Sequence, residues 1–67
     1  MTDCKALNER IKTSGLKKGH IAKSIGVSRQ SLNTKLQGER EFKLDEVTLI
    51  CKLLNISTEE RENIFFA

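Results

Sequence analysis

Apolar residues recur at spacings of three and four along most of the chain, and no stretch alternates as a strand would. In the first such run Cys4, Leu7 and Ile11 form one stripe, and Thr2 or Asp3 can cap the helix that carries it. Further runs of this kind follow residue 15, and the last begins near residue 58. The pattern predicts an all-α fold, a compact bundle of five short helices.

The second and third predicted helices are separated by a turn too tight to be an ordinary linker. Gly26 can adopt the left-handed backbone conformation that ends a helix, and Val27 offers an apolar plug beneath the turn. Ser28 is a favourable N-cap for the helix that follows. Two short helices are therefore predicted between about residues 18 and 38.

The third predicted helix, about residues 28–37, has an unusual exposed surface. Its apolar positions are only Leu32 and Leu36, so one narrow stripe is buried. The remaining side chains offer a guanidinium, amides and hydroxyls, whereas a helix meant only for solubility would more often carry Glu and Lys pairs. Such groups match the base edges and phosphates of DNA.

The turn and its flanking helices also carry a recognisable spacing of residue types, at Ala22, Gly26, Val27, Ser28, Leu32 and Gly38. This pattern resembles the helix-turn-helix of lambda-repressor-like (Cro/cI, XRE-type) DNA-binding proteins. The sequence departs from the family pattern at two positions. Members often carry Gln where this chain has Lys18, and many carry Trp or another apolar residue where it has Lys35.

The resemblance covers nearly the whole chain, because those domains have one helix before the motif and two after it. It implies a single lambda repressor-like DNA-binding domain over residues 1–67, with the motif at about 18–38 and the recognition helix at about 28–37. The EFKLDEV stretch and the apolar tail are similar to small phage and prophage repressors of Gram-positive bacteria. The implied function is transcription regulation, most simply by a Cro-like repressor that binds a palindromic operator through the major groove as a homodimer.

The resemblance also implies which residues contact double-stranded DNA. The family's base-reading positions correspond to Arg29, Gln30 and Thr34, with Ser28, Ser31 and Asn33 beside them. Arg29 can pair bidentately with guanine and Gln30 with adenine, while the methyl group of Thr34 can meet a thymine. The phosphate contacts implied are Lys17, Lys18, Ser31, Lys35, Gln37, Arg40 and Lys43.

The charges are segregated along the chain, although the net charge is only +3. From Arg10 to Lys43 there are nine basic and two acidic residues, a balance of +7, whereas the remainder has three basic and seven acidic residues, a balance of −4. Lysine and arginine supply sequence-independent affinity for nucleic acid through counterion release. Judged from charge alone, the alternative to nucleic-acid binding is a basic surface that is simply solvated.

The C-terminal third carries two apolar stripes. Residues 47, 50, 51 and 54 form the main stripe of a fourth helix beginning near Leu44, and Leu49 with Leu53 forms a second. Ser57 and Glu60 have capping-box spacing, so a fifth helix is predicted at 58–65. Either this helix folds back over the second stripe, or the apolar patch is shared with a second subunit. We favour a dimer interface, made of Leu49, Leu53, Ile64, Phe65 and Phe66, because adjacent phenylalanines on a helix point about 100° apart.

The sequence contains no recognisable catalytic or metal-binding constellation. His20 is a lone histidine without a partner at metal-ligand spacing, and the serines lie on predicted caps and exposed faces. Cys4 and Cys51 both fall on apolar faces, which favours small buried hydrophobes over a disulfide or zinc site. We therefore expect no enzyme activity, no cofactor, no bound metal and no small-molecule substrate.

Chain length and hydropathy limit the number of domains and the expected location of the protein. A chain of 67 residues supports one domain with a small core, near the size where a single core is marginal. The longest mostly apolar stretch, residues 47–54, is too short to span a bilayer, and the N-terminus lacks the apolar core of a signal peptide. We expect a cytoplasmic protein, in the bacterial nucleoid or in a phage-infected host, without a membrane partner.

Two other functions remain open at this stage. A helix-turn-helix fold can serve as a protein-interaction module, such as an antitoxin, because fold alone does not determine function. RNA binding ranks below both, since three phenylalanines and no Tyr or Trp leave little for stacking unpaired bases.

Overall fold

The helical periodicity of the sequence is realised throughout the computed structural model, which describes residues 1–66. Within this range the chain forms five α-helices and no β-strand, which confirms the all-α prediction. The helices are α1 (Cys4–Ser14), α2 (Lys18–Ile25), α3 (Arg29–Leu36), α4 (Leu44–Leu54) and α5 (Thr58–Phe65). None of these helices is long and apolar enough to cross a membrane.

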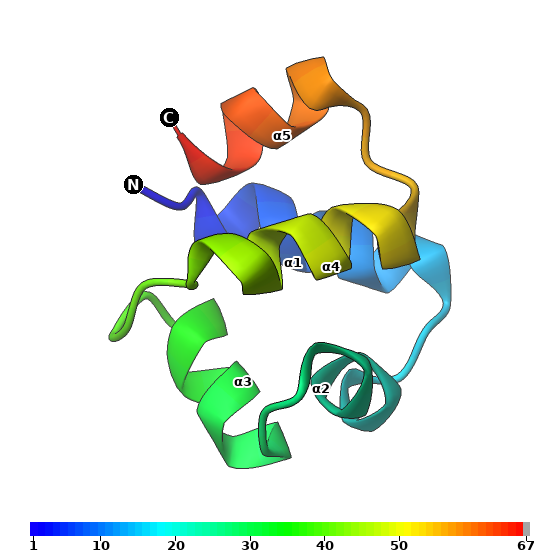
Figure 1. Ribbon diagram of the computed structural model, residues 1–67, viewed down its shortest axis with the longest axis vertical. Coiled ribbons are helices and arrows are strands. Elements are labelled where there is room, and N and C mark those ends of the chain that lie inside the picture. Colours follow the sequence, from blue (N-terminus) through cyan, green and yellow to red (C-terminus); the bar gives the residue numbers. More distant parts are fainter. Residues whose placement is uncertain (67) are drawn as a thin grey trace.

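The helices are arranged around a central pair. Helices α1 and α4 cross the middle of the molecule, with α5 at one end and α2 and α3 at the other (Figure 1). Helix α2 packs against α3 and α4, and α1 contacts α3, α4 and α5. The α2–α3 pair is therefore carried on α1 and α4, on the side of the molecule away from α5.

Local signals at the helix ends explain where most helices begin and stop. The carboxylate of Asp3 accepts a hydrogen bond from the amide of Ala6 at 3.1 Å, so Asp3 is the cap of α1. Helix α4 ends at Asn55, whose φ of 57° is the left-handed conformation that the short polar side chain of asparagine tolerates. The predicted capping box of α5 is only half formed. The Ser57 hydroxyl accepts from the Glu60 amide, but the Glu60 carboxylate pairs with Arg10 of α1.

The predicted apolar stripes meet in one core. The largest completely buried side chains are Leu7, Ile21, Leu32 and Ile50, contributed by α1, α2, α3 and α4 respectively. Burying a side chain of this size fully contributes roughly 1.5–3 kcal/mol. Each of these four helices therefore owes most of its stability to packing against its neighbours in this core.

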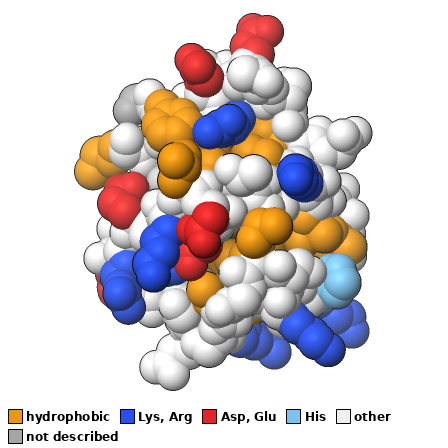
Figure 2. All heavy atoms as spheres, viewed as in Figure 1, with side chains coloured by type: hydrophobic (Ala, Val, Ile, Leu, Met, Phe, Trp, Pro, Cys, Tyr) orange, Lys and Arg blue, Asp and Glu red, His pale blue; other side chains and the backbone are white. Residues whose placement is uncertain are grey.

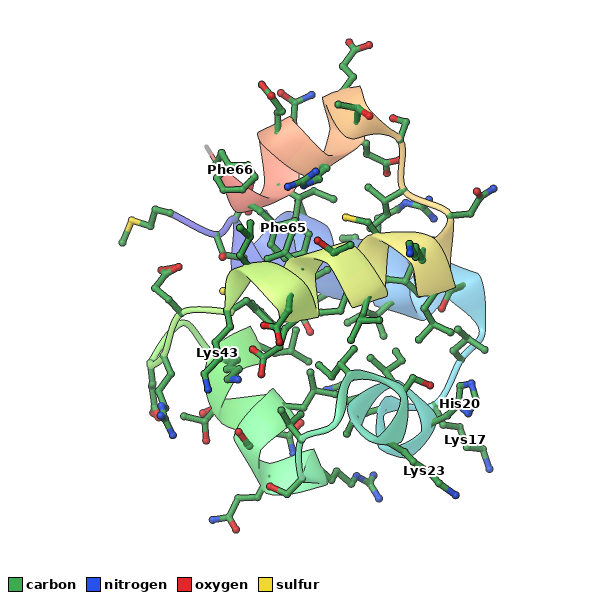
Figure 3. All side chains as sticks on the ribbon, in the orientation of Figure 1. Lys17, His20, Lys23, Lys43, Phe65 and Phe66 are labelled. Atoms are coloured by element: carbon green, nitrogen blue, oxygen red, sulfur yellow. The ribbon has the colours of Figure 1, made fainter. Side chains whose placement is uncertain are left out.

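The C-terminal apolar residues do not all lie on the surface, which corrects part of the predicted dimer interface. Ile64 and Phe65 are each only 3% exposed and belong to this chain's own core, where Phe65 meets Phe42 edge to face at 5.8 Å. Leu53 is partly buried against the same core. Leu49 and Phe66 remain 41% and 54% exposed. Phe65 is the last residue of α5 and points inward, whereas Phe66 follows the helix with a φ of −124° and points outward (Figure 3).

Candidate nucleic-acid interface

The turn between α2 and α3 is formed by local hydrogen bonds that end one helix and begin the next. Gly26 has a φ of 81°, and the amide of Val27 donates to the carbonyl of Ala22 at 3.0 Å. The hydroxyl of Ser28 then accepts from the amide of Ser31 at 3.0 Å, which caps α3. Val27 is half-buried against the core. These bonds fix where α2 ends and where α3 begins, and the packing of the two helices against each other sets how they lie.

The outward face of α3 presents the side chains predicted to contact bases. Ser28, Arg29 and Gln30 are exposed, and Asn33 and Thr34 are half-buried. The hydroxyl of Thr34 donates to the backbone carbonyl of Gln30 at 3.0 Å. Thr34 can therefore offer a ligand its methyl group and the lone pairs of its oxygen, in line with the predicted contact to a thymine methyl.

Lys35 does not lie on this face, which corrects its predicted role as a phosphate contact. It is 5% exposed, and its ammonium nitrogen donates to both carboxylate oxygens of Glu46, at 2.6 and 2.8 Å. A sequence signal for this burial exists. Lys35 lies three positions after Leu32 and one before Leu36, so it falls on the inward side of α3.

Glu46 is the other half of this buried ion pair. It is also 5% exposed, and its Oε1 atom accepts a second hydrogen bond from the backbone amide of Lys43 at 2.9 Å. Burial by itself raises the pKa of this carboxyl group, but the hydrogen bonds from Lys35 and from the Lys43 amide, with the charges of both lysines, outweigh it. The pKa of Glu46 therefore lies below its ordinary value of 4.5.

The loop of residues 37–43 places three predicted phosphate contacts beside α3. Gln37, Arg40 and Lys43 are exposed, while Phe42 anchors the loop to the core. Glu39 and Glu41 are also exposed, so the loop as a whole carries no net charge. An anionic ligand would thus have to meet Arg40 and Lys43 individually.

The N-terminus of α2 is a second place where an anion can approach. Lys17 is its N-cap residue and makes no side-chain capping bond, so the first-turn amides lack a side-chain acceptor. Lys17 and Lys18 are exposed, and a Cβ built on Gly19 would meet no atom within 4 Å. Figure 3 shows Lys17, His20 and Lys23 projecting outward from this helix. The arrangement fits an external phosphate at the positive end of the helix dipole.

The basic surface is smaller than the sequence count indicated. Lys35 is buried, and Arg10 is turned toward α5, where it pairs with Glu60 and donates to the carbonyl of Leu54 at 3.1 Å. Seven of the nine basic residues between 10 and 43 remain exposed: Lys12, Lys17, Lys18, Lys23, Arg29, Arg40 and Lys43. In Figure 2 blue side chains gather at the lower edge, at the α2–α3 end, and red ones stand at the top over α5, while both colours lie across the middle of this face. The segregation of charge along the sequence is therefore only partly a segregation in space.

Neither cysteine forms a disulfide, and neither is placed for reactivity. Cys4 is half-buried and Cys51 is buried. Burial raises the pKa of both thiols, with Glu41 adding to the effect at Cys4 and Glu60 at Cys51. Among residues 1–66, no group of three or more His, Cys, Asp or Glu side chains could hold a metal ion.

A shallow apolar hollow, which the sequence did not reveal, lies at the far side of the loop from α3. Its volume is about 200 Å³, and it is lined by Met1, Thr2, Glu41, Phe42, Leu44, Val47, Phe65 and Phe66. Leu44 is 65% exposed beside it. Leu44 and Phe66 are thus two exposed apolar side chains at the edge of this hollow.

Comparison of the chain with protein-family models, with curated proteins and with solved structures found no match. The candidate functional surface is formed by α2, α3 and the loop of residues 37–43.

Proposed function

We propose that the protein is a sequence-specific double-stranded DNA-binding transcriptional regulator of the lambda-repressor-like (Cro/cI, XRE-type) class. In this proposal α2, the turn and α3 form a helix-turn-helix, and α3 is the recognition helix. The observation that carries the proposal is the outward face of α3. It joins an exposed guanidinium, amides and hydroxyls on a helix whose other side is fixed to the core.

The contacts divide by their chemistry. Arg29 and Gln30 enter the major groove at the start of α3 and read base edges, and Thr34 follows one turn later. Lys17, Lys18, Arg40 and Lys43 bind phosphates and set position and affinity without reading sequence. Their placement on both sides of α3, at the α2 N-terminus and in the loop, supports this division.

The regulator binds a palindromic operator as a homodimer, with half-sites about one helical turn apart. It acts as a Cro-like repressor in the cytoplasm of a bacterium or a phage-infected host, by excluding polymerase from the operator. Of the residues first assigned to the subunit interface, Leu49 and Phe66 retain substantial exposed area. Leu44 joins them as an exposed apolar side chain near Phe66.

Selection of bound sequences from a random DNA pool tests the proposal. We expect a palindrome with a defined spacing, and an affinity that falls steeply with salt because phosphate contacts release counterions. The matched control is a variant with Arg29→Ala and Gln30→Ala, both exposed, which should fold normally and lose the selected sequence. A wild-type protein that enriches no sequence would contradict specific DNA binding.

A second candidate is a protein-interaction module of the same fold. The exposed Leu44 and Phe66 beside the 200 Å³ hollow favour it, because apolar patches on small domains often mark interfaces. A mobility shift on DNA from beside the gene separates the two. A pure protein module would give no salt-dependent shift.

A further inference from the structure

The buried ion pair between Lys35 and Glu46 is not used by the proposed DNA contacts, yet it lies between the two segments that make them. Lys35 is in the last turn of α3, and Glu46 is in the first turn of α4, directly after the loop of residues 37–43. Their side chains are 5% and 7% exposed. The pair thus joins the base-reading helix to the far end of the phosphate-binding loop.

One atom makes this connection. The Oε1 atom of Glu46 accepts from the ammonium of Lys35 at 2.6 Å and from the amide of Lys43 at 2.9 Å. Because both donors converge on one oxygen, the end of α3 and the end of the loop are held at a set separation. The Lys35 nitrogen also lies 6.0 Å from the ring centre of Phe42, the loop's apolar anchor.

Few hydrogen bonds join the loop to α3. At its start the amide of Glu39 donates to the carbonyl of Thr34 at 3.2 Å, and Gly38 has a φ of 83°. At its end the carbonyl of Lys43 accepts from the amide of Val47 at 3.0 Å, a bond to α4, and Thr2 makes an exposed contact of 3.4 Å with Glu41. Among the residues that the structure describes, the Lys35–Glu46 pair is the hydrogen-bonded link between the end of the loop and α3.

Stability alone does not account for charges at these two positions. Taking both groups out of water costs free energy, and buried ion pairs replaced by apolar side chains of similar size often give equally stable or more stable proteins. What the pair supplies that an apolar contact lacks is direction, because two short hydrogen bonds to one carboxylate define a single geometry.

We propose that Lys35 and Glu46 are positioning residues that set the phosphate-binding loop against the recognition helix, so that Arg40 and Lys43 reach the backbone when α3 is seated on its bases. This inference rests on the proposed DNA-binding function. Neither residue touches DNA. They act through the placement of Lys43 and Arg40 relative to Arg29 and Gln30.

The test is a neutral replacement of the pair, Lys35→Met combined with Glu46→Gln. The change leaves the net charge and the exposed basic residues unaltered, and glutamine keeps an acceptor for the Lys43 amide. The matched control is Arg10→Met with Glu60→Gln. It removes the ion pair between α1 and α5, at the opposite end of the molecule, by the same chemical change.

Affinity is measured on the selected operator and on an unrelated duplex of equal length. For Lys35→Met with Glu46→Gln we expect operator affinity to fall by about tenfold, comparable to the loss of one good base contact. Affinity for the unrelated duplex should stay within about twofold, since it follows the unchanged charge. Amide hydrogen exchange should show faster exchange at Lys43 without DNA. The control should leave the affinity ratio and the Lys43 amide unchanged.

The outcomes are separable. A folded double variant that keeps the wild-type ratio overturns the positioning role, and so does an equal loss in the control. If the first variant does not fold, Lys35→Met with Glu46→Leu, which makes both positions apolar, is measured with the same expectations. A wild type that prefers no sequence overturns the proposed function instead, and the positioning role falls with it.

Discussion

At the scale of single residues, exposed side chains of similar charge have different roles according to where they sit. Arg29 stands at the first position of α3, where its guanidinium can pair with two acceptors of one guanine. Lys18 stands in the first turn of α2 and offers a point charge beside the helix amides. Both are exposed, so neither contributes much to folding.

This difference leads to a prediction about specificity. Replacing Arg29 by alanine should cost roughly 1–3 kcal/mol on the best site and relax the preference at one base pair. Lys18→Ala should instead weaken binding to all sequences similarly and reduce the salt dependence. Titrations on the selected site, on its single-base variants and on unrelated DNA measure both. An unchanged ratio of specific to unrelated binding in Arg29→Ala would remove that residue from base reading.

At the scale of the elements, the α2–α3 turn depends on backbone conformation at one glycine. A Cβ added at Gly26 would meet no atom within 4 Å, so the empty space there imposes no steric limit. The restriction on substitution comes from the backbone, because residues other than glycine rarely adopt a φ of 81°. Gly19 offers the same free space without a positive φ, inside α2.

The two glycines allow a matched pair of stability measurements. Gly26→Ala should destabilise the fold by about 1–2 kcal/mol and lower the melting temperature by several degrees, because about 4–8 °C corresponds to each kcal/mol in a domain of this size. Gly19→Ala should raise it slightly, since alanine favours a helix interior. Equal melting temperatures for the two variants would show that the turn does not require a left-handed residue.

The contact between α3 and α4 should make stability sensitive to acid. Because the pKa of Glu46 is lower in the folded chain than its ordinary value of 4.5, the ion pair stabilises the fold at higher pH. This stabilisation is lost as the pH falls through the lowered pKa. Thermal melts from about pH 6 downward should show a shallower decline for Lys35→Met with Glu46→Gln than for the wild type. Parallel declines in the two proteins would mean that another carboxylate dominates.

At the scale of the whole molecule, the two C-terminal phenylalanines have separate roles. Phe65 completes the core against Phe42, while Phe66 is exposed, with the Arg61 guanidinium 5.6 Å from its ring centre. A domain of this size has a core near the lower limit for stability, so the burial of Phe65 adds to a small core while Phe66 stays accessible. Contact with a second subunit would bury Phe66 in turn.

Single truncations should therefore give different results. Phe65→Ala should destabilise the monomer by about 3–5 kcal/mol whatever the protein concentration. Phe66→Ala should cost the monomer only about 0.5–1 kcal/mol, the value of an exposed cation–π contact, while weakening self-association and operator affinity. Sedimentation across a concentration series, combined with thermal melts, measures both effects. A wild type that is monomeric at the highest concentrations would contradict a dimer in the absence of DNA.

What the sequence determined by itself is local. The five helices, the caps at Ser28 and Ser57, and the buried stripes of α1 to α4 follow from neighbours three or four positions apart, and such patterns need no knowledge of the fold. The cap of α1 was limited to Thr2 or Asp3, and the structure has Asp3. The exposure of Arg29 and Gln30 on α3 followed in the same way.

Only the tertiary structure decided which charged side chains form ion pairs and which aromatic side chains are buried in the core. Lys35 meets Glu46 across 11 positions and Arg10 meets Glu60 across 50, so each pairing depends on how helices are placed relative to one another. Lys35 is therefore buried, and Arg10 is half-buried against α5 and no longer part of the basic surface. Phe65 turned inward because α5 packs on α1 and the loop supplies Phe42, contacts that no short-range pattern contains. Periodicity identifies which face of a helix is apolar, but the partner that covers this face is set by packing between elements far apart in the chain.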